Sequence, residues 1–219
     1  MDQEAIMNDI LDKSMDCGTT AQQLIDVYDK WAKGYDQDII KFKYKGPEYL
    51  LDLLQVYVED KDIRILDICA GTGAVGKALR VSGFDNVDGH DGSAEMLAVA
   101  QSYGIYRNVY VELLSSDVES ELPEQQYDAI VSVGGFTAQM NESQIHKFIN
   151  CAKPGGKIFF GFAEELETEE FIDKLKELEQ KKVISTLCRK AYDRYRLRDL
   201  KTEEYTRGIF YALQVCKDD

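Results

Sequence analysis

The 219-residue sequence is short of positive charge: 26 Lys and Arg stand against 40 Asp and Glu, which gives a formal charge of −14 at pH 7. Proteins that bind nucleic acid gain much of their affinity from clustered cations that neutralise phosphates. The shortage therefore argues against nucleic acid as a partner. One basic cluster, interleaved with tyrosines, comprises Arg189, Lys190, Arg194, Arg196, Arg198 and Lys201. We interpret this cluster as a solvated surface of a strand and a loop.

The sequence also lacks long apolar runs and paired cysteines. Its apolar runs are far shorter than the roughly 20 residues that span a membrane, and the N-terminus is acidic rather than signal-like. The five cysteines are odd in number and show no Cys-x-x-Cys spacing, so neither a disulfide framework nor a zinc site is indicated. We expect a soluble, cytoplasmic protein with no membrane association and no bound metal.

Histidine is scarce as well, and this limits the choice of a general base. His90 comes directly before Asp91 in an expected buried strand, and His146 lies on an expected helix. We expect both to be structural. Cys69 is likewise expected to be a small buried thiol. No catalytic residue can be named, and the acceptor-activating motif Asn-Pro-Pro-Tyr does not occur.

What the chain does contain is a strand followed by a glycine-hinged loop. The apolar, β-branched run at 63–69 predicts a strand covered on both faces, and Gly71, Gly73 and Gly76 then allow a tight turn into a helix. Such a turn is typical of a site for an adenosine cofactor. Because the glycine spacing with Asp91 also matches the dinucleotide fingerprint, a nicotinamide-dependent oxidoreductase is one alternative.

Asp67 argues against a dinucleotide. It lies at the end of the expected strand, where its carboxylate would repel a pyrophosphate. The sulfonium and ammonium groups of S-adenosylmethionine suit a carboxylate at this place better. Asp91, at the end of the next strand, is placed to accept hydrogen bonds from both ribose hydroxyls. Alternatively it caps the following helix, a role that Ser93 could take instead.

Three motifs in this order resemble a class I S-adenosylmethionine-dependent methyltransferase over about residues 25–162: Asp67-x-x-x-Gly71-x-Gly73, Gly89-His90-Asp91-Gly92-Ser93-x-x-Met96-Leu97 and Lys153-Pro154-Gly155-Gly156-Lys157. The resemblance implies an enzyme that moves the methyl group of S-adenosylmethionine by in-line displacement to an O or N nucleophile of a small-molecule substrate and releases S-adenosylhomocysteine. A cofactor-binding regulatory or partner subunit without its own acceptor is the alternative. The oligomeric state is left open.

The resemblance and the residue pattern together give a set of expected site residues. Met96 would pack on the adenine or in the core, and Asp117 and Val118 would meet the adenine edge. The cofactor-binding set is Tyr35, Asp67, Ala70, Gly71, Gly73, Asp91, Gly92, Met96, Asp117, Val118 and Val133. The substrate set is Tyr28, Trp31, Gly134 and Phe136.

Residues 1–45 are expected to form a helical cover. A helix from Ala21, capped by Thr19 or Thr20 and interrupted at Gly34, places Tyr28, Trp31 and Tyr35 on one face. That face can lie over the cofactor as a mobile lid, although Trp31 could equally be a core residue.

The remaining pattern predicts an α/β fold in one domain spanning 1–219. Strands at 63–69, 86–90, 109–114, 127–133 and 157–162 alternate with helices at about 74–82, 94–103 and 141–152. A helix at 168–182 precedes two strands, 183–196 and 206–216. The expected architecture is a Rossmann-like, doubly wound, mostly parallel seven-stranded sheet, closed by an antiparallel C-terminal hairpin as the resemblance implies.

Overall fold

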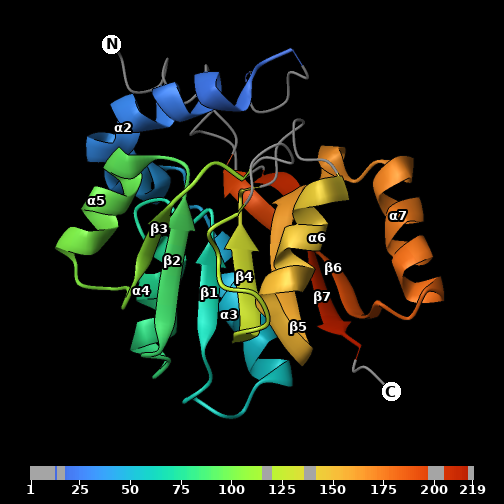
Figure 1. Cartoon of the computed structure of the whole chain (residues 1–219). Coiled ribbons are helices and arrows are strands. Elements are labelled where there is room, and N and C mark those ends of the chain that lie inside the picture. The colour runs from blue at the N-terminus through green and yellow to red at the C-terminus, as the bar shows by residue number, and fades with distance from the viewer. Residues whose placement is uncertain (1–12, 14–17, 115–119, 136–141, 197–204, 217–219) are drawn as a thin grey trace.

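The computed structural model describes residue 13 and residues 18–114, 120–135, 142–196 and 205–216. A seven-stranded sheet of order β3-β2-β1-β4-β5-β7-β6 runs through the fold (Figure 1). The strands are β1 (Ile65–Ile68), β2 (Val87–Asp91), β3 (Val109–Val111), β4 (Tyr127–Val133), β5 (Ala152–Ala163), β6 (Ile184–Arg196) and β7 (Tyr205–Val215). The helices are α2 (Ala21–Lys41), α3 (Gly46–Tyr57), α4 (Ala74–Val81), α5 (Ala94–Ser102), α6 (Glu142–Cys151) and α7 (Glu169–Gln180).

The strand pairing confirms the predicted fold class. β1 pairs in parallel with both β2 and β4, and β2–β3 and β4–β5 are parallel too. β7 runs antiparallel between β5 and β6 and makes the C-terminal hairpin. The winding reverses between β1 and β4, and in open α/β sheets ligands bind beyond the carboxyl ends of the strands at such a reversal.

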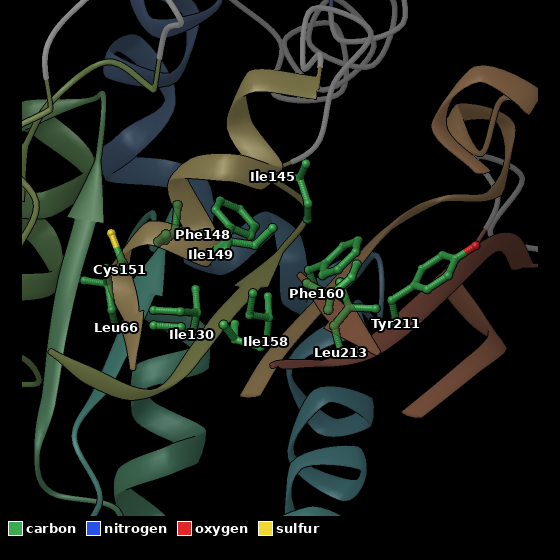
Figure 2. Close-up of a cluster of buried hydrophobic side chains, with 14 of the residues drawn as sticks. Leu66, Ile130, Ile145, Phe148, Ile149, Cys151, Ile158, Phe160, Tyr211 and Leu213 are labelled. Carbon is green, nitrogen blue, oxygen red and sulfur yellow. The ribbon is translucent and has the colours of Figure 1, made fainter. Parts of the chain in front are cut away.

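Two apolar clusters cover the two faces of the sheet. Leu50, Leu54 and Leu79 from α3 and α4 pack on one face, and Phe148 from α6 and Leu175 from α7 pack on the other. Figure 2 shows the second cluster, in which Phe148 and Ile145 lie over strand residues such as Ile130 and Phe160. All four residues of β1 are buried, as a strand covered on both sides requires. Each fully buried aliphatic or aromatic side chain stabilises the fold by about 1.5–3 kcal/mol.

The N-terminal helix differs from the prediction at Gly34. Thr20 caps α2 in a capping box with Gln23, and the helix then runs without a break to Lys41. A glycine in a helix interior costs about 1 kcal/mol. Packing of the aromatic side chains of α2 and the hydrogen bond from Trp31 Nε1 to Asp38 Oδ2, at 2.8 Å, offset that cost. The expected interruption was therefore wrong, and α2 lies across the carboxyl ends of the parallel strands (Figure 1).

Other boundaries differ from those expected by a few residues. β5 begins at Ala152 rather than 157, because Ala152 pairs with Tyr127 before the register shifts. β3 ends at Val111, short of the expected 114. Among the described residues, the structure contains no helix long and apolar enough to cross a membrane.

Candidate active site

The glycine loop lies between β1 and α4, at the reversal in strand order. Gly71 has φ +55°, and a Cβ built on it would meet no atom within 4 Å. Gly73, at φ +86°, is the N-cap residue of α4. A left-handed backbone with open space beside it suits the close approach of a ligand to the main chain.

The Asp91 carboxylate is fixed at the end of β2 by two backbone amides. Its Oδ2 accepts from the Gly71 N–H and its Oδ1 from the Ser93 N–H, both at 2.8 Å. Ser93 accepts from the Met96 N–H at 3.1 Å, so Ser93 is the cap of α5. Burial raises the pKa of Asp91, while these N–H groups oppose the rise. A carboxylate has about four lone-pair positions, so Asp91 can still accept from hydroxyl donors.

Asp67 is fully buried at the end of β1, and only one of its two carboxylate oxygens is hydrogen-bonded within the described residues. The Tyr106 hydroxyl donates to its Oδ2 at 2.6 Å. Within the described part of the chain, Oδ1 is buried and has no hydrogen-bond partner. Burial, together with the nearby Asp91 charge, raises the pKa of Asp67 to about 7, although the Tyr106 hydrogen bond opposes the rise. An unpaired buried acceptor costs about 1–3 kcal/mol, so this oxygen suits a bound donor.

Tyr106 supports Asp67 and was not found from the sequence. Its ring fills the space that the glycines leave: a Cβ on Gly76 or on Gly89 would come within 2.6 Å of Tyr106 ring carbons. The third glycine of the fingerprint-like spacing therefore accommodates this ring. The glycine spacing indicated that something packs closely at Gly76. It did not indicate Tyr106, which comes from the loop before β3.

Helix α2 is attached directly to the loops after β1 and β2 through two aspartates. Asp29 Oδ1 accepts from the Ser93 hydroxyl at 2.5 Å, and Asp36 Oδ1 accepts from the Thr72 hydroxyl at 2.5 Å. Asp36 Oδ2 also pairs with Lys77 Nζ at 2.8 Å. Burial would raise the pKa of Asp36, but the bonds from Lys77 and Thr72 lower it on balance. Neither aspartate was among the site residues expected from the sequence.

The aromatic face of α2 is largely taken up by packing. Trp31 is only 3% exposed and its ring lies edge-on to Tyr35 at 4.5 Å, which favours the core interpretation of Trp31. Tyr28 and Tyr35 are half-buried. Met96 is 1% exposed, so its packing role is also favoured over contact with an adenine.

The smaller expected cofactor residues line the same loops. The buried Ala70 donates its N–H to the His90 carbonyl at 2.9 Å, which joins the ends of β1 and β2. A Cβ on Gly92 would come within 2.7 Å of Ile25, so α2 lies directly over the turn after β2.

The end of β4 forms the other wall of the site. Val133 is half-buried, and Gly134 follows with φ +76°. A Cβ on Gly134 would lie 3.0 Å from the Tyr44 hydroxyl and 4.0 Å from Arg194 Nη2. Neither residue was expected at the site from the sequence. Three other expected site residues lie outside the described residues: Asp117, Val118 and Phe136.

Of the histidine and cysteine nearest the site, His90 is buried and Cys69 is half-buried. His90 is fully buried, and burial lowers its pKa to about 4, so it is neutral near pH 7. Burial raises the pKa of the Cys69 thiol well above its ordinary value. The described residues contain no group of three or more His, Cys, Asp or Glu that could hold a metal ion.

Comparison with known proteins agrees with this geometry. Residues 65–156 match the family described as "Methyltransferase domain". Human methyltransferase-like protein 27 is 33% identical over 138 residues, which cover 62% of this chain and 56% of that protein. The match thus spans little more than half of the human relative's length.

Solved structures share the fold. In the complex between the Haloferax volcanii Trm112 methyltransferase activator and a methyltransferase, the matched chain has a TM-score of 0.65 and 16% identity, over 87% of this chain and 98% of that one. A protein named provisionally as an RNA methyltransferase, from Pyrococcus horikoshii, has a TM-score of 0.58 and 14% identity, over 78% and 83%. The chain thus shares the Rossmann-like fold of these structures, with the glycine loop, Asp67 and Asp91 at the reversal of its seven-stranded sheet, and its residues 65–156 match a methyltransferase domain.

Proposed function

We propose that the protein transfers a methyl group from S-adenosylmethionine to an O or N nucleophile of a small molecule, by in-line displacement. When bound, S-adenosylmethionine supplies a methyl group already activated by the positive sulfonium. The protein then has to hold donor and acceptor in line, which can remove about 7–11 kcal/mol of the barrier. No side chain is assigned as a general base, and a cytoplasmic location is part of the proposal.

One observation carries the cofactor part: among the described residues, the buried Oδ1 of Asp67 has no hydrogen-bond partner, and the loop that follows β1 has open space at Gly71. An ammonium group would satisfy that oxygen, whereas a pyrophosphate would be repelled by Asp67 and Asp91 together. The Asp91 carboxylate, held by Gly71 and Ser93, is oriented to accept from ribose hydroxyls. The residues present therefore fit S-adenosylmethionine.

A small-molecule acceptor is favoured over nucleic acid on electrostatic grounds. The chain carries a formal charge of −14, and a polyanion would have to overcome this field before reaching the site. The likeness to a protein named as an RNA methyltransferase is at 14% identity and concerns the fold.

Labelled methyl transfer tests the proposal. The protein is incubated with S-adenosylmethionine carrying a radioactive methyl group and with a metabolite extract, before and after removal of molecules too large for a small-pore filter. We expect labelled product from the small-molecule fraction. Tight binding of S-adenosylhomocysteine without any product would instead favour a regulatory or partner subunit, and product only from nuclease-sensitive material would contradict a small-molecule acceptor.

A further inference from the structure

Three side-chain atoms meet at one point beside the end of β4. A Cβ built on Gly135 would lie 2.5 Å from Cys69 Cβ, 2.7 Å from Cys69 Sγ and 3.1 Å from Ser132 Oγ. Gly135 comes shortly after β4, whereas Cys69 is the first residue of the glycine loop after β1. The space that a side chain at position 135 would need is thus occupied by a residue of the neighbouring loop.

This contact, and not its own backbone, requires a glycine at position 135. Gly134 has φ +76°, but Gly135 is not among the glycines with positive φ. Favourable contact between two carbon atoms begins at about 3.5 Å, so a Cβ at 2.5 Å is a severe overlap. Because Cys69 Cβ is bonded directly to the main chain, Gly135→Ala could be accommodated only if the backbone of one loop moved.

Cys69 itself has an unusual backbone conformation. Its φ is +59°, in a region that glycine adopts readily and that residues with a side chain rarely adopt. The other described non-glycine residues with positive φ are Lys43, Gln125 and Lys182, and all three are exposed residues of turns. Cys69 is instead half-buried in the site. A side chain at a strained position that a glycine would relax indicates that its Cβ and Sγ have a role.

The glycine loop is also joined to the end of β2. The Ala70 N–H donates to the His90 carbonyl at 2.9 Å, and the Gly71 N–H donates to Asp91 Oδ2 at 2.8 Å. Strand β1 lies between β2 and β4 in the sheet (Figure 1). Cys69, directly before these two residues, therefore connects the end of β2, to which we assign the ribose, with the end of β4, to which we assign the acceptor.

The hydroxyl of Ser132 indicates that a bound group completes this place. Ser132 is fully buried, and within the described residues its Oγ has no hydrogen-bond partner. A buried hydroxyl without a partner is unfavourable, so its presence in a site suits a ligand or an ordered water. The Cys69–Gly135 contact thus borders a polar position at the carboxyl end of β4.

We propose that Cys69 is a positioning residue for methyl transfer: its side chain, packed against Gly135, sets the distance between the glycine loop and the end of β4, and so between methyl donor and acceptor. The inference rests on the proposed function. In-line transfer needs reacting atoms about 3–3.5 Å apart, and a misplacement of about 1 Å can cost about a hundredfold in rate. The role depends on the size of the side chain and not on the chemistry of its sulfur.

Exchanging the two side chains tests the inference. Gly135→Ala should weaken binding of S-adenosylhomocysteine by about tenfold in calorimetry, because the added Cβ displaces the glycine loop and with it the Gly71 N–H. Adding Cys69→Gly removes both clashing atoms, while the Cβ at position 135 fills the space that they leave. The double variant should therefore bind S-adenosylhomocysteine within about threefold of wild type.

Cys69→Gly alone separates positioning from binding. The gap that it leaves loosens the distance between the two loops, so labelled methyl transfer to the small-molecule fraction should fall by about tenfold. Affinity for S-adenosylhomocysteine should change by less than about threefold, because the bonds of Ala70 and Gly71 to the end of β2 remain. Cys69→Ser keeps a side chain of similar size and should restore most of the transfer, as should the double variant.

Gly156→Ala is the matched control. A Cβ on Gly156 would also be crowded, 2.8 Å from the Lys153 carbonyl oxygen, and Gly156 likewise has no positive φ. It lies against the Tyr127 carbonyl, at the opposite end of β4. Gly156→Ala should lower the midpoint of thermal unfolding without changing affinity for S-adenosylhomocysteine, and adding Cys69→Gly should not restore that midpoint.

The inference is overturned if Gly135→Ala loses stability but keeps its affinity, because the contact would then be packing alone. A double variant that neither binds nor transfers better than Gly135→Ala would overturn it too, and so would wild-type transfer in Cys69→Gly. If Gly135→Ala does not fold, the last two comparisons still decide. Failure of the proposed function would look different, because wild-type protein itself would then bind no S-adenosylhomocysteine or give no labelled product.

Discussion

The two halves of the site are built in different ways. The half to which we assign the cofactor consists of the loops that directly follow β1 and β2, where the backbone amides of Gly71 and Ser93 hold Asp91. The half to which we assign the acceptor combines the end of β4, the segment after α2 and the end of β6, so that Tyr44 and Arg194 lie near Gly134. The difference shows that a site built from local backbone geometry leaves a readable sequence motif, whereas a site built from side chains of remote segments does not.

The largest expected effect concerns the glycine loop of the cofactor half. Gly71→Val places a branched side chain at φ +55°, in the open space that the cofactor should enter. Binding of S-adenosylhomocysteine should weaken by about 3 kcal/mol or more, roughly a hundredfold, in calorimetry.

Gly83→Val is the matched control for that variant. Gly83 also has a left-handed backbone, φ +88°, and open space, but it follows the far end of α4. Both variants should lose about 1–3 kcal/mol of unfolding free energy from strain. Near wild-type affinity in Gly71→Val, or equal loss in both, would show that the loop does not carry the cofactor.

The next effect concerns Asp91. Asp91→Ala removes both of its backbone hydrogen bonds and the expected ribose acceptor, and should weaken S-adenosylhomocysteine by about 1.5–3 kcal/mol. The exposed Asp85→Ala changes the net charge equally and should leave affinity unchanged. A folded Asp91→Ala protein with wild-type affinity would show that the cofactor does not bind at the end of β2.

Asp67 should make cofactor binding depend on pH. Burial raises its pKa to about 7 in the folded protein, whereas in the unfolded chain the same carboxyl ionises near pH 4. The free energy of unfolding therefore falls as pH rises from about 4 to about 7. A ligand ammonium favours the carboxylate form. Affinity for S-adenosylhomocysteine should therefore increase by about tenfold from pH 6 to pH 8, with proton release on binding.

Asp67→Asn should abolish that dependence. Calorimetry in buffers of different ionisation enthalpy measures the released proton directly. As pH rises from about 4 to about 7, the unfolding free energy of Asp67→Asn should increase relative to that of wild type, because the variant lacks the titrating carboxyl. An unchanged proton release in Asp67→Asn would assign the titration to another group and remove Asp67 from the contact with the ligand.

The smallest expected effect concerns α2. Because Asp29 and Asp36 bind Ser93 and Thr72, ligand binding at those loops should tighten the helix, and amide exchange across 20–44 should slow when S-adenosylhomocysteine is added. Asp36→Asn should weaken binding by less than about 1 kcal/mol, since Asp36 is only half-buried.

The exposed Asp26→Asn, on the same helix, is the control and should change neither quantity. Exchange equally slow with and without ligand would make α2 a fixed part of the fold rather than a lid, and would agree with the packed position of Trp31. The strand Ile65–Ile68 should stay protected throughout.

The fold followed from the sequence where patterns are local. The buried run of β1 and the cap of α2 at Thr20 were readable from residue type. The break expected at Gly34 was wrong because the Trp31–Asp38 bond and side-chain packing, which local propensity does not include, hold the helix together.

The residues of the candidate site could likewise be predicted only where the sequence pattern is local. Gly71 and the carboxylates of Asp67 and Asp91 were identified from motif spacing, which records the constraints of the loop itself. Tyr106 and Arg194 were not, because each reaches the site through tertiary packing of a distant segment. Arg194 had been assigned to a solvated surface, since a charge run carries no information about which strand its partners lie on.

A crystal structure of the protein with S-adenosylhomocysteine tests the division of the site most directly. We predict the ribose hydroxyls within hydrogen-bonding distance of the Asp91 carboxylate, the ligand ammonium toward Asp67, and the sulfur facing Gly134. A ligand whose ribose lay away from Asp91, or whose sulfur faced away from the end of β4, would contradict the account.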